Sequence, residues 1–100
     1  MRTIGKAGMR KAAIEVAWRL RAIRKARGLN TMTFGKRLKM SQAQVSRIET
    51  GLQGLRSAVI VRACSVLQVS PAALFIERPL AKALLKSPLG RKIPGLQYVV

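Results

Sequence analysis

Apolar residues recur every three or four positions through the first three quarters of the chain, which is the spacing of one buried face of an α-helix. Serine, glycine and proline interrupt this pattern at places where helices begin or end. The pattern predicts an all-α fold with five helices, which cover residues 10–27, two short segments between Asn30 and Gly51, residues 57–68 and residues 71–76.

The first predicted helix has one continuous apolar face. We expect this face to consist of Ala13, Val16, Ala17, Leu20 and Ile23. Arg19 and most of the other basic residues of the helix point elsewhere, whereas Arg24 lies close to the apolar face. Trp18 is off the face, and we expect it either to pack against another part of the chain or to anchor a dimer contact.

The fourth predicted helix begins after Ser57, which can cap its first turn. Its core positions are expected to be Ile60, Ala63, Cys64 and Leu67. Val59, Val66 and Arg62 lie off this face. Exposed valines on a helix of a small basic protein favour a contact between subunits.

The fifth predicted helix is short. Ser70 is expected to be its N-cap and Pro71 its first residue, where the missing N–H of proline costs nothing. Leu74 and Phe75 follow at positions that should seal the core.

The two short helices between Asn30 and Gly51 share a distinctive arrangement. Phe34 and Leu38 form the apolar face of the first, and Val45 and Ile48 that of the second. Ser41 is a good N-cap for the second helix, and Gly51 suits a left-handed C-terminal cap. The residues left facing outward are small, polar or cationic, which is the chemistry needed to meet base edges and phosphates: Gln42, Ala43, Gln44, Ser46 and Arg47.

The charge of the chain points to nucleic acid as its partner. Twenty lysines and arginines stand against three acids, a formal net charge of +17 over 100 residues. Such a chain repels itself unless it meets a polyanion. No apolar run is long enough to span a membrane. The single cysteine, Cys64, cannot form an internal disulfide, and we expect it to act as a small core residue in a cytoplasmic protein.

The same composition argues against catalysis. The chain has no histidine, and its three carboxylates, Glu15, Glu49 and Glu77, are scattered. They supply neither an acid–base pair nor a metal cluster. We therefore expect no catalytic residues, no metal site and no cofactor.

Two stretches carry a resemblance to a known family. The segment NTMTFGKRLKMSQAQVSRIETG, residues 30–51, resembles the helix-turn-helix of the Cro/CI-type (XRE-like) repressors, and its SRIETG ending is similar to the family's S-R-I-E-N-G. The later LQVSPAALF is similar to L-G-V-S-x-x-x-L-F. The similarity runs from about Val16 to Phe75 and implies a five-helix lambda-repressor-like domain that binds double-stranded DNA.

The resemblance also assigns roles to residues. It implies that Gln42 reads an A·T pair and that Arg24 and Glu49 form a structural ion pair. The start of the second helix, with Thr31 and Thr33, is aimed at the DNA backbone, although family members often have Gln in place of Thr31. They usually have Gly in place of Lys39, so this lysine needs a left-handed conformation while it adds a cation near DNA.

The remaining contacts follow from side-chain chemistry. Ala43 can touch a thymine methyl group, and Gln44 and Ser46 can reach bases or phosphate. Arg47 can read a guanine or bind phosphate. In the loop at residues 52–56, the backbone near Gly54 and the side chain of Arg56 are expected to contact phosphate.

The segments on either side of the predicted domain, residues 10–76, lack the resemblance. Residues 1–9 are expected to form a flexible basic arm. Residues 77–100 form a C-terminal extension, with a short helix at residues 80–86 and no regular structure after Pro88. Its last four residues are strand-like and apolar, and they can pair with a second subunit or a partner protein.

These observations support one main function and two alternatives. The main one is a homodimeric transcriptional regulator, expected to be a repressor that blocks its promoter. The first alternative is an antitoxin that binds DNA through the helix-turn-helix and a toxin through residues 77–100. The second is a non-specific nucleic-acid-binding protein, which the spread of positive charge also favours.

Overall fold

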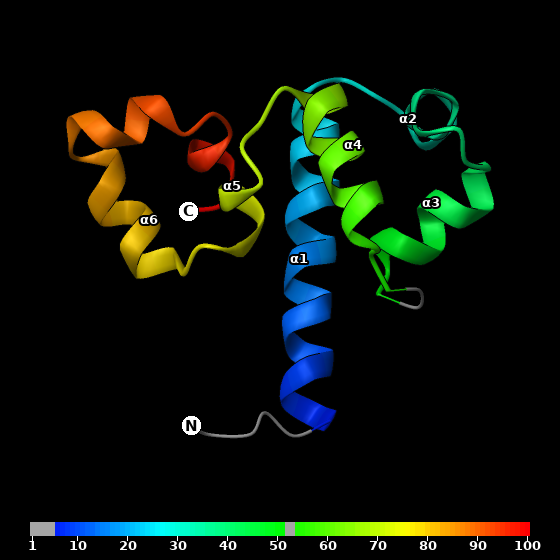
Figure 1. Ribbon diagram of the computed structural model, residues 1–100, viewed down its shortest axis with the longest axis horizontal. Helices are drawn as coiled ribbons and strands as arrows, with labels where there is room; N and C mark the ends of the chain where they lie inside the picture. The colour runs from blue at the N-terminus through cyan, green and yellow to red at the C-terminus, as the bar shows by residue number, and fades with distance from the viewer. Residues whose placement is uncertain (1–5, 52–53) are drawn as a thin grey trace.

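The computed structural model describes residues 6–51 and 54–100 and is all-helical over these residues (Figure 1). The predicted all-α fold is therefore confirmed. The elements in chain order are α1 (Lys6–Ala26), α2 (Thr31–Leu38), α3 (Gln42–Glu49), α4 (Ser57–Leu67), α5 (Ala72–Phe75), α6 (Arg78–Leu85) and the 3₁₀ helices η1 (Pro88–Lys92) and η2 (Leu96–Tyr98).

Helix α1 is the central element of the molecule. Figure 1 shows α2, α3 and α4 on one side of it and α6 with the C-terminal turns on the other. The helix begins at Lys6, so the prediction of a flexible arm is wrong for residues 6–9, and residues 1–5 lie outside the described part. Once residues from Ala17 onward are packed, each further residue adds a helical hydrogen bond at little cost.

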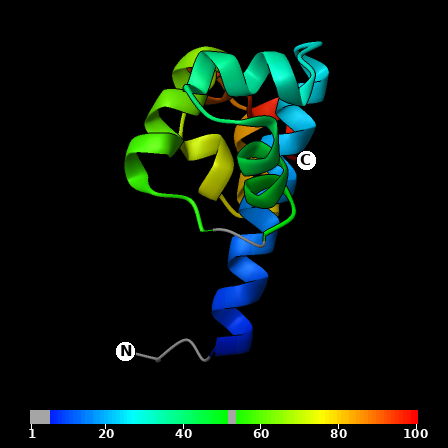
Figure 2. The ribbon, with the colours of Figure 1, turned by 90° about the vertical axis from the view of Figure 1, so that its right-hand side faces the viewer.

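Two residues of α1 differ from their predicted placement. Ala13 is exposed, because the N-terminal part of α1 extends past the other helices (Figure 2). Arg19 is buried, although it was expected to point away from the core. Its guanidinium is satisfied by the carbonyl oxygens of Ala73 and Ile76 and by the carboxylate of Glu15.

Helices α2 and α3 meet at a tight turn. Asn30 caps α2 by accepting a hydrogen bond from Thr33 N at 2.8 Å. Lys39 ends α2 in the left-handed region with φ 58°, as the comparison with glycine in the family implied. A Cβ atom on Gly35 would lie 2.7 Å from the carbonyl oxygen of Met40, so glycine is needed where the turn folds back on α2.

Helix α4 differs from its prediction in two respects, the N-cap and the extent of the buried face. Its N-cap is Arg56 rather than Ser57. Val59 and Val66 are half-buried against the core, so the prediction that they are exposed is wrong. The exposed valine of this helix is Val61, at 63%. The error arises because α2 packs against α4 and the common core also reaches Val59 and Val66, which widens the buried face of α4.

The short helix α5 starts one residue later than predicted. Ser70 Oγ accepts from Ala72 N at 3.2 Å, and Pro71 precedes the helix instead of opening it. Leu74 is buried, but Phe75 is 56% exposed and does not seal the core. The chain turns to an extended conformation at Ile76, so α5 is too short to bury both side chains.

The C-terminal segment, residues 77–100, folds back onto the domain instead of ending as a strand-like tip. Leu96 is fully buried and Val99 is nearly so. Ser70 N donates to the carbonyl oxygen of Pro94 at 2.8 Å. Prolines that exclude α-helix still permit single 3₁₀ turns, and these bring the apolar residues inward.

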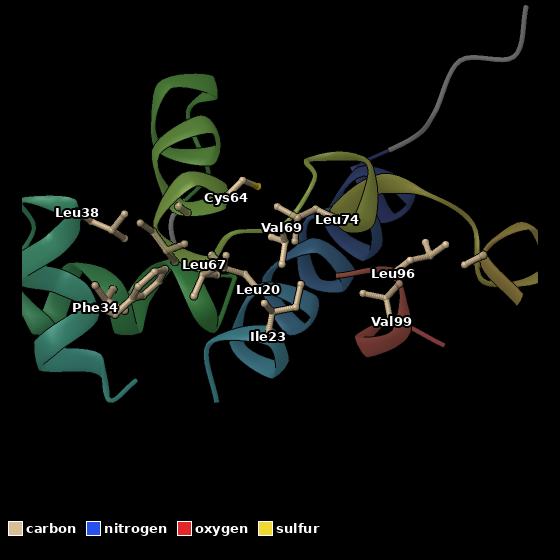
Figure 3. Close-up of a cluster of buried hydrophobic side chains, with 14 residues drawn as sticks. Leu20, Ile23, Phe34, Leu38, Cys64, Leu67, Val69, Leu74, Leu96 and Val99 are labelled. Carbon is tan, nitrogen blue, oxygen red and sulfur yellow. The ribbon is translucent and has the colours of Figure 1, made fainter. Parts of the chain in front are cut away.

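One hydrophobic core joins the two parts of the molecule (Figure 3). Phe34, Leu38 and Leu67 lie on one side of α1, and Leu74 and Leu96 lie on the other, with Leu20 and Ile23 of α1 between them. None of the helices in the described ranges is long and apolar enough to cross a membrane.

Candidate nucleic-acid interface

Helix α3 presents a polar outer face and an anchored inner face. The five residues predicted to face outward are all exposed, whereas Val45, Ile48 and Glu49 are buried. Its N-terminus is held by a capping box, in which Ser41 Oγ accepts from Gln44 N at 3.1 Å and Gln44 Oε1 accepts from Ser41 N at 2.9 Å. The helix thus begins at a defined residue, which sets the direction of its first side chains.

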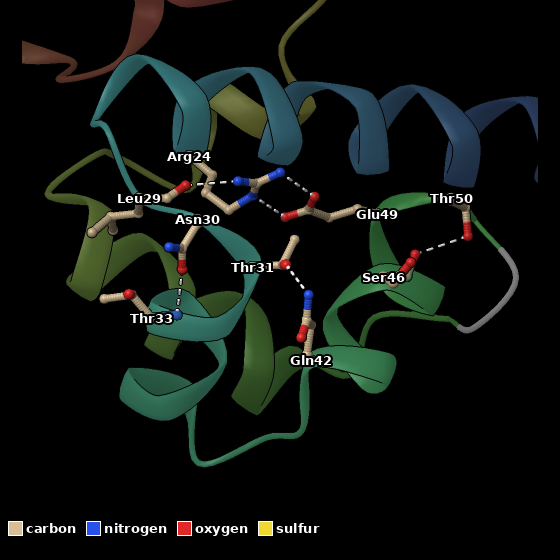
Figure 4. A network of polar contacts seen from close by, with 9 residues as sticks. All are labelled: Arg24, Leu29, Asn30, Thr31, Thr33, Gln42, Ser46, Glu49 and Thr50. Carbon is tan, nitrogen blue, oxygen red and sulfur yellow. Dashed lines mark hydrogen bonds and ion pairs between the residues drawn. The ribbon is translucent and has the colours of Figure 1, made fainter.

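A buried ion pair fastens α3 to α1 (Figure 4). Arg24 Nε donates to Glu49 Oε2 at 2.7 Å, and Arg24 Nη2 donates to Glu49 Oε1 at 2.9 Å. Arg24 Nη1 also donates to the carbonyl oxygen of Leu29 at 2.6 Å. The structure contains the pair that the resemblance implied, and its two parallel hydrogen bonds fix the orientation of α3 as well as its distance from α1.

Gln42 and Thr31 are in direct contact, which the sequence did not indicate. Gln42 Nε2 donates to Thr31 Oγ1 at 3.0 Å, so the first residue of α3 is tied to the first residue of α2 (Figure 4). A threonine hydroxyl that accepts this bond retains its own proton to donate. The two residues therefore form one unit, in which Thr31 limits the rotamers of the Gln42 side chain.

Gln44 is only partly available for a ligand. Its side-chain oxygen accepts the capping hydrogen bond from Ser41, which leaves its NH₂ group as the exposed donor. Ser46 has an exposed side chain, and its backbone carbonyl accepts from the hydroxyl of Thr50 at 2.9 Å. The sequence placed both residues correctly on the outer face but did not show that Gln44 has a second role.

The flanking residues of the predicted site lie on three different elements. Thr33 is half-buried in the first turn of α2, Lys39 is exposed in the turn before α3, and Arg56 is exposed just before α4. Leu52 and Gln53 of the predicted phosphate loop lie outside the described residues. Arg62 of α4 was assigned no role, yet its Nη1 donates to the carbonyl oxygen of Leu38 at 3.0 Å and supports the turn.

The described residues offer little other chemistry. Among residues 6–51 and 54–100, no group of three His, Cys, Asp or Glu side chains lies close enough together to hold a metal ion. Burial raises the pKa of the Cys64 thiol above its usual value, as expected for a cysteine that serves as a core residue.

The comparison with protein families decides what this arrangement is. The family model of the helix-turn-helix domain matches residues 15–74. The chain belongs to this family. The matched region contains α2, the turn and α3, and it extends to most of α1 and α5, so it covers the helices that hold the motif as well as the motif itself. Neither the curated proteins nor the solved structures contain a significant match to this chain.

Proposed function

We propose that this protein is a sequence-specific transcriptional regulator that places α3 in the major groove of DNA. The observation that carries the proposal is the outer face of α3, which is polar, exposed and held in one orientation by the Ser41 cap and the Arg24–Glu49 pair. An α-helix fits the major groove, and its first residues reach the base edges. A fixed orientation matters because base readout depends on where each side chain is aimed.

Gln42 is the leading candidate for base readout. Its side-chain NH₂ group can donate to N7 of adenine while its side-chain oxygen accepts from N6. Both contacts form only when the amide is correctly oriented. The hydrogen bond from Gln42 Nε2 to Thr31 supports this role, because it holds the side chain near one rotamer before DNA binds. Ala43 and Arg47 extend the same exposed face, toward a thymine methyl group and toward a guanine or phosphate.

The backbone contacts would come from the surrounding elements. The hydroxyl groups of Thr31 and Thr33 lie at the N-terminus of α2, where helix N–H groups favour a phosphate. Lys39 and Arg56 are exposed cations on either side of α3 along the chain. The net charge of +17 supplies a general attraction for DNA that would add to these contacts.

We further propose that the protein binds as a homodimer and represses transcription by occupying its promoter. Helix-turn-helix domains commonly bind two half-sites one helical turn apart, so operator symmetry mirrors protein symmetry. The test is selection of binding sites from a random duplex library at about 150 mM salt, where the screening length is about 8 Å. Enrichment of a pseudo-palindrome supports the proposal. Binding without any enriched sequence would refute sequence-specific regulation and favour the non-specific alternative.

The antitoxin alternative depends on a tail that is free to bind a toxin. Residues 77–100 were the segment expected to bind a toxin, but their apolar residues Leu96 and Val99 are built into the core of the domain. A toxin that binds residues 77–100 would have to use their outer surface, which includes Leu80 and Leu89. Regulation of transcription therefore remains the better supported function.

A further inference from the structure

Trp18, the only tryptophan of the chain, stands on the outer face of α1. It is 63% exposed, as much as any other large apolar side chain in the described residues. With 3.6 residues per turn, Trp18 lies about 200° around the helix from the core residue Leu20 and about 120° from Arg24, which holds α3. The expectation that Trp18 packs against its own chain is therefore wrong, and its side chain faces neither the core nor α3.

Two shallow hollows flank this tryptophan. One, of about 230 Å³, lies between α1 and the C-terminal segment and is lined by Trp18, Ala22 and Tyr98 among others. The other, of about 340 Å³, lies along α1 and is lined by Trp18, Arg21, Ala22 and Lys25. A tryptophan side chain can bury 150–250 Å² and is a typical anchor of a protein interface. Trp18 thus borders both hollows, each of which combines apolar and basic side chains.

The charges around Trp18 restrict what can bind there. Arg21 and Lys25 are exposed cations one and two turns further along α1. The nearby acid, Glu15, is already engaged, at 3.2 Å from Arg19 and 3.0 Å from Arg78. Among the described residues of this face, no second acid offers a counter-charge.

A second copy of the chain is a poor occupant for this surface. A two-fold symmetric contact brings the same patch of both subunits together, so the cations Arg21 and Lys25 of both copies would gather at one contact. A partner with carboxylates around an apolar centre has the complementary charge.

We propose that the Trp18 surface, made of Trp18, Arg21, Ala22 and Lys25, docks an acidic amphipathic segment of a different protein. Apolar side chains of the segment fill the hollows beside the indole ring, and its carboxylates pair with Arg21 and Lys25. This inference is independent of the proposed DNA binding, because the surface lies on another face of α1 from the one that holds α3.

The experiment uses the tryptophan fluorescence of the full chain, which reports on Trp18 alone. The probe is a synthetic helical peptide with leucine on one face and glutamate on the other, titrated at about 150 mM salt. We expect a saturable blue shift of the emission, because the indole ring leaves water. With a fluorescein-labelled peptide, anisotropy should show that Trp18→Ala weakens binding at least tenfold, whereas Val61→Ala, a change at an equally exposed site on α4, leaves it unchanged.

Charge-reversal variants test the second half of the proposal. Arg21→Glu with Lys25→Glu should also weaken peptide binding at least tenfold. Lys82→Glu with Lys86→Glu, two exposed positions of the C-terminal segment, changes the net charge equally and should have a much smaller effect. Equal loss in both double variants would show a general charge effect and overturn the proposal.

Three further results would overturn it. The first is an unchanged emission at saturating peptide. The second is a shift of Trp18 emission on adding duplex DNA together with weaker DNA binding by Trp18→Ala, which would assign the surface to DNA. The third is a dimer in sedimentation that Trp18→Ala dissociates, which would assign it to a second copy. Circular dichroism of each variant checks that it is folded.

Discussion

Arg19 and Arg24 are buried, whereas the other arginines from Arg21 to Arg91 are exposed. Each is accepted in the interior because its guanidinium donates to several oxygens: Arg24 donates to Glu49 and the carbonyl of Leu29, and Arg19 donates to Glu15 and two carbonyls of the α5 region. A buried charge without such partners costs several kcal/mol. The two arginines therefore act as fixed crosslinks from α1 to the two sides of the molecule.

The Arg24–Glu49 crosslink gives a direct prediction at the residue scale. Glu49→Ala leaves the buried guanidinium of Arg24 without its carboxylate, and it should lower the free energy of unfolding by about 3–5 kcal/mol. Glu77→Ala, which removes an exposed acid, should change it by no more than about 0.5 kcal/mol. Thermal unfolding followed by circular dichroism measures both, and equal melting temperatures would contradict a structural role for the pair.

Gln42 is the residue whose change should alter sequence preference. Gln42→Ala should cost about 1–3 kcal/mol on the selected site and relax the preference at one base pair, because its amide no longer distinguishes the bases. Gln97→Ala, an exposed glutamine of the C-terminal segment, is the matched control and should leave binding intact. Fluorescence anisotropy on single-substituted duplexes makes the measurement. An unchanged preference in Gln42→Ala would mean that α3 is not the recognition helix.

At the scale of elements, α2 and α4 end in the same way. Lys39 with φ 58° and Gln68 with φ 57° each hold the left-handed conformation at a helix C-terminus, where glycine is the usual residue. At both ends the next backbone N–H groups satisfy the last carbonyls of the helix. The chain therefore tolerates the strain of a left-handed non-glycine residue at both helix ends, but only Lys39 adds a cation next to α3.

Substitutions at these two caps can distinguish an effect on stability from an effect on DNA binding. Lys39→Gly and Gln68→Gly should each stabilise the protein by about 0.5–1 kcal/mol, since the strain of about 1–2 kcal/mol exceeds the entropic cost of glycine. Lys39→Gly should in addition weaken DNA binding and lower the salt slope by about one unit. Urea unfolding and binding at several salt concentrations measure the two effects. Equal DNA binding by both variants would remove Lys39 from the interface.

At the scale of the whole molecule, the C-terminal segment closes the hydrophobic core. Leu96 and Val99 pack on α1 and near Val69, and a Cβ atom on Gly95 would lie 2.6 Å from Val69 Cγ1. The guanidinium of Arg27 lies 5.4 Å from the ring centre of Tyr98 and donates to the carbonyl oxygen of Leu67. The segment therefore belongs to the folding unit and is not an appended tail.

Substitution of two leucines of this segment tests whether the segment is folded onto the domain in solution. Leu96→Ala should lower the free energy of unfolding by about 2–5 kcal/mol, because it leaves a cavity where the side chain is 0% exposed. Leu89→Ala, at 55% exposure, should change it by no more than about 0.5 kcal/mol. Chemical denaturation gives both values. A neutral Leu96→Ala would show that the segment detaches in solution.

The charge of the whole molecule predicts how binding responds to salt. Arg56→Ala should weaken binding to all duplexes similarly and reduce the slope of log K against log salt by about one unit, because one phosphate contact is lost. Lys82→Ala removes the same charge from an exposed site on α6 and should leave the slope nearly unchanged. A loss confined to one sequence would reassign Arg56 to base readout.

The sequence by itself determined the elements that depend on local chemistry. Helical spacing, the cap at Ser41 and the residue types on the outer face of α3 are all properties of neighbouring residues. The family resemblance added the Arg24–Glu49 pair, which joins residues 25 positions apart and has no local signal. The DNA contacts of the outward residues stay a prediction.

Only the tertiary structure decided which residues on a helix are covered. Arg19 became buried and Phe75 exposed because burial depends on how far α1 extends, how short α5 is and where the C-terminal segment returns. Trp18 stayed exposed for the same reason, since the C-terminal segment borders only one side of it, at Tyr98 and Val99, and leaves the side chain 63% exposed. Periodicity shows which face of a helix is apolar, whereas the packing of elements distant in sequence sets what covers that face.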